Sequence, residues 1–213
     1  MSRPTVLLAD DHRIVLEGLR SLLEPEFDLV GTVPDGRALL KAAKELDPDV
    51  IVLDISMPSL NGIEAARKLR ESGVRAGIVF LTMHPDAAYA TRALDAGASG
   101  YVLKHSAPDE LVTAIRQALK GGTYVSPRLA GELAHAYGSN APRREDPESN
   151  LTPRQREVLQ LLAEGRSAKD IADTLCISPR TVEFHKYRMM EELNIKTTAE
   201  LVRYAVKHGI VSE

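Results

Sequence analysis

Short apolar runs alternate with amphipathic stretches over the first half of the chain. A run that is apolar throughout is typical of a strand buried on both faces of a sheet. The stretches between the runs place leucine and alanine at helical spacing and are long enough to be right-handed crossovers. We therefore predict an α/β fold with a doubly wound, five-stranded parallel sheet, whose strands fall at residues 5–10, 29–33, 49–54, 77–82 and 99–103.

The second half of the chain has a different pattern. A helix at about residues 108–120 ends at two glycines, and a short helix is expected at 127–137. Residues 138–150 contain two prolines and no large apolar side chain, which is typical of a linker. We predict a first domain at 1–121, a linker with a short helix at 122–147, and a smaller all-α domain at 148–213.

The start of the all-α domain carries its own helix signal. Thr152, Pro153 and Gln155 occupy the N-cap, N1 and N3 positions of a capping box. The single cysteine, Cys176, cannot form an internal disulfide, and we expect it to be a small buried residue in a turn.

Composition sets limits on the class of protein. Apolar residues make up 44% and charged residues 27%, which excludes a wholly disordered chain. The first residues are too short and too acidic at their end for a signal peptide or membrane span, so we expect a cytoplasmic protein with no membrane partner. Residues 150–213 hold 10 basic and 9 acidic side chains, so bulk charge does not indicate nucleic-acid binding.

Polar residues end the predicted strands: Asp10 and Asp11, Asp54, Thr82, and Lys104. In an open parallel sheet the functional crevice lies at the carboxyl ends of the strands. Carboxylates that converge there repel one another unless a hard cation such as Mg²⁺ lies among them. A lysine and a threonine from neighbouring strands complete a site for a phosphoryl group carried on a carboxylate.

These residues resemble the receiver domains of two-component response regulators, over residues 5 to about 121. The resemblance implies a flavodoxin-like strand order 2-1-3-4-5 and Asp54 as the phosphoacceptor. It also implies Mg²⁺ held by Asp11, Asp54 and the Ser56 carbonyl, with Asp10 reaching the ion through water. The remaining roles that it implies are the switch residues Thr82, Tyr101 and Lys104, and the residues that tune acyl-phosphate hydrolysis, Ser56 and His84.

Two other classes of protein fit this half of the chain less well. A phosphatase of the haloacid dehalogenase type needs a general acid two residues after its aspartate, where this chain has Ser56. A nucleotide-binding domain needs a glycine-rich phosphate loop such as G-x-G-x-x-G, which the sequence lacks. We therefore expect no enzyme. A regulator that uses its first domain only as a phosphorylation-independent interaction module remains the rival hypothesis.

Within the all-α domain, residues 167–175, 176–178 and 179–193 have the pattern of a helix, a tight turn and a second helix. A helical wheel places Val182, Met189 and Leu193 on the core face of the second helix. Phe184 and Tyr187 fall on the opposite face. This arrangement predicts a helix-turn-helix whose second helix enters a DNA groove.

The candidate DNA-contacting residues surround those two aromatic side chains. From residue 178 to 190 three basic side chains oppose one acidic side chain, so the local balance is +2. The alternative is a solvated helix in a small interaction module. The candidates are Ser178, Arg180, Thr181, Glu183, Phe184, Lys186, Tyr187 and Arg188.

This half resembles the LuxR-type DNA-binding domain through Leu151 to Leu159, Glu164-Gly165 and Thr181 to Glu183, and the two halves together resemble the NarL/FixJ class of response regulators. Ala168, where asparagine is common, departs from the pattern, as does the aromatic run 184–187. In that family the last helix packs two DNA-binding domains together. The implied dimer residues are Leu201, Val202 and Ala205, although packing within their own domain is an equal alternative.

The resemblance implies a sensor histidine kinase, a double-stranded DNA operator, a phosphorylation-promoted homodimer and the transcription machinery as partners. The implied function is a transcription factor whose DNA binding is controlled by phosphorylation of Asp54. Whether the first domain occludes the second or acts mainly through dimerisation stays open.

Overall fold

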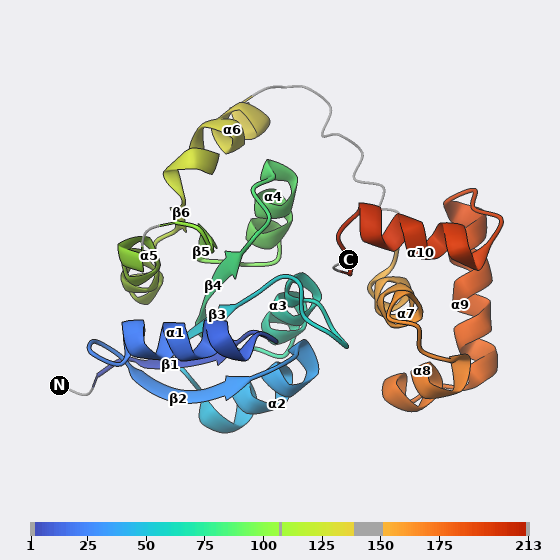
Figure 1. The fold of residues 1–213 in the computed structure, drawn as a ribbon, viewed down its shortest axis with the longest axis horizontal. Helices are drawn as coiled ribbons and strands as arrows, with labels where there is room; N and C mark the ends of the chain where they lie inside the picture. Colours follow the sequence, from blue (N-terminus) through green and yellow to red (C-terminus); the bar gives the residue numbers. More distant parts are fainter. Residues whose placement is uncertain (1–2, 107, 139–150, 212–213) are drawn as a thin grey trace. The chain divides into compact units, whose positions relative to one another are not determined.

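The apolar runs form the strands of one parallel sheet in the computed structural model, which describes residues 3–106, 108–138 and 151–211 (Figure 1). The strand order is β2-β1-β3-β4-β5-β6, which confirms the predicted flavodoxin-like order. The strands are β1 Thr5–Ala9, β2 Asp28–Val33, β3 Val50–Leu53, β4 Gly77–Thr82, β5 Gly100–Leu103 and β6 Tyr124–Val125.

The sixth strand was not predicted. β6 has two residues and pairs in parallel with β5 through Gly100 and Tyr101. It leads into α6 (Pro127–Gly138), which contacts α4 (Ala87–Asp95). The compact first unit therefore includes β6 and α6. The predicted linker at 138–150 lies, from residue 139 onward, outside the described residues.

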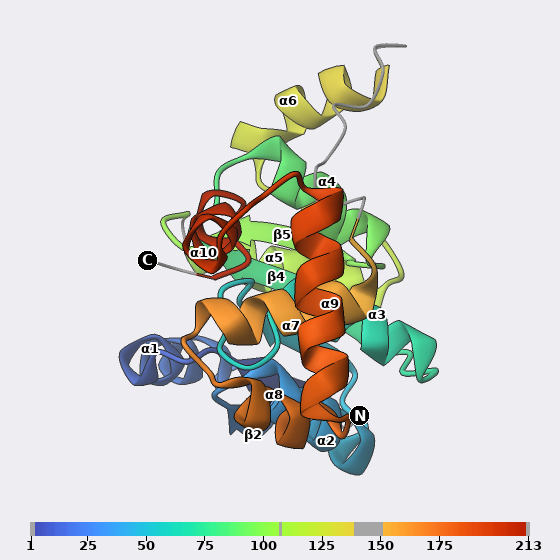
Figure 2. The ribbon, with the colours of Figure 1, turned by 90° about the vertical axis from the view of Figure 1, so that its right-hand side faces the viewer.

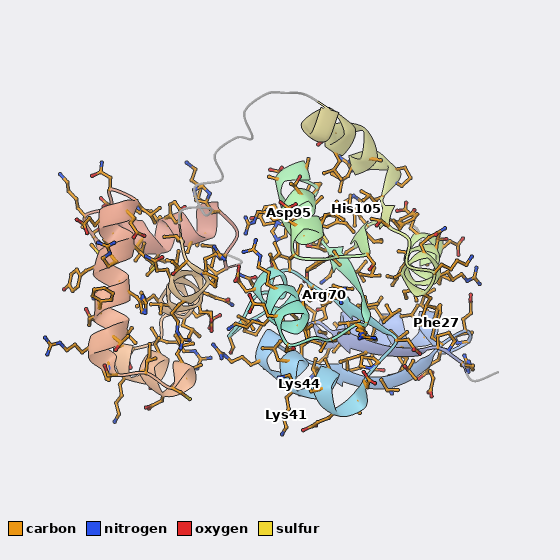
Figure 3. The ribbon with its side chains drawn as sticks, turned by 180° about the vertical axis from the view of Figure 1, so that it is seen from behind. Phe27, Lys41, Lys44, Arg70, Asp95 and His105 are labelled. Atoms are coloured by element: carbon orange, nitrogen blue, oxygen red, sulfur yellow. The ribbon has the colours of Figure 1, made fainter. Side chains whose placement is uncertain are left out.

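Helices cover both faces of the sheet (Figure 1). α1 (Arg13–Leu23) and α5 (Pro108–Leu119) share one core cluster, to which Leu23, Val52 and Ile115 contribute. α2 (Gly36–Leu46) and α3 (Gly62–Glu71) contact each other on the other face, and α3 also contacts α4. On α3, the Arg70 guanidinium donates to the backbone carbonyls of Val74, Ala76 and Gly97, which ties the helix to two loops (Figure 3). The predicted doubly wound architecture is confirmed.

The second unit consists of α7 (Pro153–Ala163), α8 (Ala168–Leu175), α9 (Pro179–Glu192) and α10 (Thr198–Lys207). The predicted capping box is present at Thr152 and Gln155. Figure 2 shows α9 along its length, with the turn to α8 at one end and the connection to α10 at the other. Val182 and Met189 are fully buried in the core of this unit, as the wheel predicted.

Cys176 lies in the turn between α8 and α9 but is exposed, which corrects the expectation that it is buried. It is the C-cap of α8 and has a left-handed backbone conformation (φ 52°). Among the described residues, no helix is both long enough and apolar enough to span a bilayer.

Candidate functional site

Backbone pairing brings the polar strand ends together. The amide of Asp54 donates to the Ala9 carbonyl at 2.9 Å, and the amide of Lys104 donates to the Thr82 carbonyl at 2.8 Å. Because β1, β3, β4 and β5 run in parallel, the side chains that follow their carboxyl ends emerge at one edge of the sheet. Asp10 and Asp54 are almost fully buried there, with 2% and 4% of their surface exposed.

The ammonium group of Lys104 joins the two buried carboxylates. Its Nζ lies 2.6 Å from Asp10 Oδ2 and 2.7 Å from Asp54 Oδ2. Burial lowers the pKa of Lys104, but the charge of Asp54 and hydrogen bonds to both carboxylates outweigh burial and raise the pKa above its usual value. The lysine is therefore charged, and it neutralises carboxylates that otherwise repel each other.

Asp11 and His12 form the exposed side of this cluster. His12 Nδ1 lies 2.8 Å from Asp11 Oδ1 and 3.2 Å from Asp10 Oδ1. One ligand atom from each of Asp10, Asp11, His12 and Asp54 falls within 4.8 Å of the others. The three carboxylates supply the oxygen donors that suit Mg²⁺. The sequence interpretation missed His12, although its position directly after two aspartates was the signal available.

Gly62, the first residue of α3, packs against the phosphoacceptor candidate. A Cβ atom at this position would lie 2.1 Å from the Asp54 carbonyl oxygen. The Gly62 amide donates to the Ile55 carbonyl at 2.8 Å, which closes the loop onto the strand end. Gly62 is therefore needed for close backbone approach rather than for turn chemistry alone.

Ser56 and His84 meet across the site. Ser56 Oγ lies 2.9 Å from His84 Nε2, so the loops after β3 and β4 are joined. The His84 ring stacks on Tyr89 at 4.3 Å, and the Arg92 guanidinium lies 5.1 Å from the centre of the Tyr89 ring. Burial lowers the pKa of His84, while the charge of nearby Asp54 opposes the shift. The imidazole is thus held on both its edge and its face.

Tyr101 points inward. Its side chain is fully buried, and its hydroxyl donates to the His84 carbonyl at 2.8 Å. Burial raises the pKa of the Tyr101 phenol above its ordinary value. Thr82 is also fully buried, and its hydroxyl oxygen accepts from the His84 amide at 3.4 Å. Both switch candidates therefore converge on the backbone of one residue.

Ser126 connects β6 to this region and was not singled out in the sequence. It is buried, its amide donates to the Tyr101 carbonyl at 3.0 Å, and its hydroxyl donates to Glu110 Oε2 at 2.6 Å. Its hydroxyl oxygen also lies 3.3 Å from Ser106 Oγ. Ser126 thus fastens the start of α6 to β5 and α5.

The helix-turn-helix is built as predicted. The Ser178 hydroxyl accepts from the Thr181 amide at 3.1 Å and caps the start of α9. The Ile177 amide donates to the Ala172 carbonyl at 3.0 Å, which fixes the turn. Phe184 and Tyr187 are 60% and 62% exposed on the face opposite the core.

The cations of α9 are mostly paired within the helix. Lys186 forms an ion pair with Glu183, and Arg188 lies 3.5 Å from Glu191 and 3.6 Å from Glu192. Extending the count of charges to residue 192 gives three basic and three acidic side chains. The local balance of +2 therefore overstated the positive charge on this helix.

The dimer candidates divide into two kinds. Leu201 and Ala205 are fully buried in the core of their own unit, which favours the alternative that they pack within their own domain. An amphipathic helix uses the same apolar face for either purpose, which is why the sequence did not distinguish them. Val202 is partly exposed and stays a prediction.

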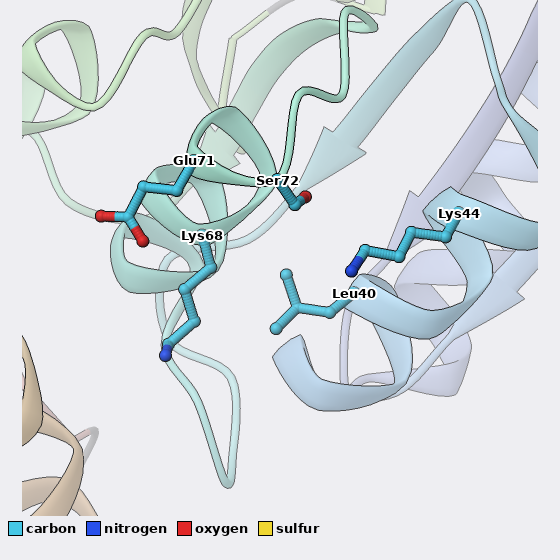
Figure 4. Close-up of a pocket in the computed structure, with 5 residues that line it drawn as sticks. All are labelled: Leu40, Lys44, Lys68, Glu71 and Ser72. Atoms are coloured by element: carbon cyan, nitrogen blue, oxygen red, sulfur yellow. The ribbon is translucent and has the colours of Figure 1, made fainter.

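A shallow depression of about 360 Å³ lies between α2 and α3 (Figure 4). It shares no residue with the Asp54 cluster. Its lining consists of Leu40, Lys44, Lys68, Glu71 and Ser72.

Comparison with known families matches both units. Residues 6–116 match the response regulator receiver domain, and residues 149–205 match the bacterial regulatory proteins of the luxR family. A transcriptional regulatory protein, MctR of Rhizobium johnstonii, is 40% identical over 98% of this chain and 95% of its own length. The response regulator GacA of Pseudomonas aeruginosa is 39% identical over 97% of each chain.

Solved structures show the same similarity. A LuxR-family two-component response regulator from Aurantimonas sp. SI85-9A1 covers 65% of this chain and all of its own, with a TM-score of 0.62 and 41% identity. RcsB of Salmonella enterica serovar Typhimurium, solved on a promoter with the phosphomimetic BeF3⁻, covers 97% of this chain and all of its own, with a TM-score of 0.64 and 31% identity. The similarity therefore spans both units.

Proposed function

The chain belongs to the LuxR-family response regulators, and from that premise we propose that phosphorylation of Asp54 controls its binding to operator DNA. The observation that carries the proposal is the pairing of Lys104 with both Asp54 and Asp10 at 2.7 and 2.6 Å. It supplies a buried nucleophilic carboxylate and a cation within reach of the same oxygen atoms. An ion pair with a purely structural role would need neither the third carboxylate, Asp11, nor a position at the carboxyl edge of the sheet.

In the proposed phosphoryl transfer, an oxygen of Asp54 attacks the phosphorus of a phosphohistidine on a sensor kinase. The new bond is an acyl phosphate, and the N–P bond to the histidine breaks. Asp10, Asp11, Asp54 and the Ser56 carbonyl would hold Mg²⁺, which neutralises phosphoryl oxygens when it is bound. Ser56 and His84 would tune how fast water hydrolyses the product.

The phosphoryl group adds a charge of about −1.5 to −2 at Asp54. We propose that Lys104 moves from the carboxylates to a phosphoryl oxygen, that Thr82 donates its hydroxyl to another, and that the buried Tyr101 is held inward in this state. Since β5 carries Tyr101 and pairs with β6, a shift of β5 would reach α6 through Ser126.

The proposed output is binding of α9 in the major groove of an operator, through residues 178–188. A single small domain makes few contacts, so we propose a homodimer, promoted by phosphorylation, with Val202 at its contact. The same proposal includes the transcription machinery as a partner, the cytoplasm as the location and the absence of a catalysed reaction on a separate substrate.

The test measures, by fluorescence anisotropy, how tightly the full chain binds genomic DNA fragments. Wild type and Asp54→Ala are each measured with and without Mg²⁺ and a small phosphodonor. We expect the phosphodonor to tighten binding at least tenfold for wild type only. Asp11→Ala serves as a matched control that keeps the nucleophile and removes a proposed metal ligand.

Equal affinity in every condition overturns phosphorylation control and leaves the rival, a regulator whose first domain is an interaction module. Tightening that persists in Asp54→Ala assigns the phosphoryl group to another residue. Loss of all DNA binding in wild type overturns the proposed output.

A further inference from the structure

Two aromatic rings stand exposed on one face of α9. Phe184 and Tyr187 are three residues apart and expose 60% and 62% of their surface, whereas Val182 and Met189 on the other face are fully buried. Leaving such side chains in water forgoes a large share of their burial energy. A paired exposure of this kind marks a contact surface.

The charges around these rings nearly cancel. Lys186 pairs with Glu183 and also lies 4.9 Å from the centre of the Tyr187 ring. Arg188 is held by Glu191 and Glu192. Among the described residues, Arg180 enters no ion pair, and it lies in the first turn of the helix. The face therefore has an apolar centre with one unpaired cation at its end.

An apolar centre of this kind is complementary to the apolar groups on the base edges of duplex DNA. In the major groove the apolar group on a base edge is the C5-methyl of thymine, while guanine and cytosine present polar atoms. Residues three apart on a helix are separated by about 4.5 Å along its axis, which is more than the step of about 3.4 Å between successive base pairs and less than two such steps. Two rings on α9 are therefore spaced to reach neighbouring base pairs rather than the same one.

We propose that Phe184 and Tyr187 are specificity-determining residues that contact the methyl groups of neighbouring thymines. The inference rests on the proposed function, because it needs α9 to lie in the major groove. It differs from phosphate-based affinity, since the contact is apolar and insensitive to salt. Arg180 supplies the contact that depends on salt.

The experiment first selects a bound sequence for the full chain, treated with BeF3⁻ and Mg²⁺, from duplexes with a randomised centre. Each thymine is then replaced by deoxyuridine, which removes only the methyl group, and affinity is measured by fluorescence anisotropy. Loss of one buried methyl is expected to weaken wild-type binding about fourfold at two neighbouring positions. Phe184→Ala is expected to bind the thymine and deoxyuridine duplexes equally at one of them.

Two matched variants separate the effect of the apolar contact from the effect of the charge. Phe184→Leu keeps an apolar side chain and should keep the response to deoxyuridine, while Arg180→Gln should weaken every duplex and keep that response too. Circular dichroism confirms that these exposed substitutions leave the fold intact.

If wild-type affinity stays the same when any of the thymines is replaced by deoxyuridine, this inference is overturned. The proposed function still stands in that case, because DNA is still bound. Failure to enrich any duplex overturns the proposed function instead. If Phe184→Ala leaves the affinities and the response unchanged but shifts the oligomeric state in sedimentation, the face contacts a second copy and the inference is wrong.

Discussion

Ser56 Oγ and His84 Nε2 lie 2.9 Å apart and bridge the loops that follow β3 and β4, next to Asp54. The bridge is reinforced because His84 stacks on Tyr89 and its carbonyl accepts from Tyr101. The side chains proposed to tune hydrolysis are therefore one hydrogen-bonded unit rather than two separate groups.

Breaking this bridge is expected to shorten the lifetime of phosphorylated Asp54. Ser56→Ala removes one hydrogen bond of about 1 kcal/mol and admits water between the loops, so the half-life should fall roughly fivefold. Decay of phosphoprotein on phosphate-affinity gels measures it. His84→Gln, which can still bond to Ser56, should stay closer to wild type; a half-life unchanged in Ser56→Ala contradicts the prediction.

Replacing Lys104 is expected to destabilise the first unit. Lys104→Met leaves the buried carboxylates of Asp10 and Asp54 without their cation, at a cost of about 3 kcal/mol in the free energy of unfolding. Urea unfolding with and without Mg²⁺ measures the loss, and the ion should recover part of it. If Mg²⁺ stabilises Lys104→Met no more than wild type, these carboxylates do not share an ion.

Gly62→Ala tests the close approach to Asp54. The added Cβ would lie 2.1 Å from the Asp54 carbonyl oxygen, so the loop must shift, and we expect a loss of about 2 kcal/mol together with slower phosphorylation. Calorimetric unfolding and phosphodonor uptake measure the two effects. Gly18→Ala on α1, where a Cβ meets nothing within 4 Å, is the control and should stabilise by about 0.5–1 kcal/mol.

Ser126→Ala is expected to loosen α6. The substitution removes the hydroxyl that donates to Glu110 at 2.6 Å, and the loss of this hydrogen bond costs about 1 kcal/mol locally. Hydrogen exchange of the first turns of α6 should accelerate. Ser21→Ala, which loses only a bond to its own helix at 3.2 Å, is the control. Equal exchange in both variants would show that Ser126 does not hold α6.

Arg180→Gln is expected to weaken DNA binding evenly across sequences. Because the other cations of α9 are paired within the helix, the slope of log affinity against log salt should fall by about one unit. Salt titrations by anisotropy measure the slope, and Arg166→Gln outside α9 is the comparison. A slope that does not change would place Arg180 away from the phosphates.

The periodicity of the sequence predicted the main strands and helices well, because buried parallel strands and amphipathic helices leave strong patterns. The convergence of Asp10, Asp54 and Lys104 also followed, since parallel strands share one carboxyl edge. β6 was missed because two residues are too few for a periodicity, and its pairing depends on backbone geometry.

Side-chain partners were harder to predict. Arg188 contributed to the local balance of +2 because its acidic partners, Glu191 and Glu192, lie one turn further along the helix, outside residues 178–190. Leu201 looked available for a dimer because a buried face and an interface require the same apolar residues. The stacking of His84 on Tyr89 depends on rotamers, which no sequence pattern specifies.

The pairing of β6 with β5 also determines where the first unit can be cut. A fragment that ended at residue 121 would strip Gly100 and Tyr101 of their partners and leave the amides and carbonyls of β5 facing water. Such an open margin is a template on which a second chain can add a strand. The two residues of β6 cover this edge and so oppose edge-to-edge aggregation. Self-association of a shortened fragment would therefore say little about how the whole protein assembles.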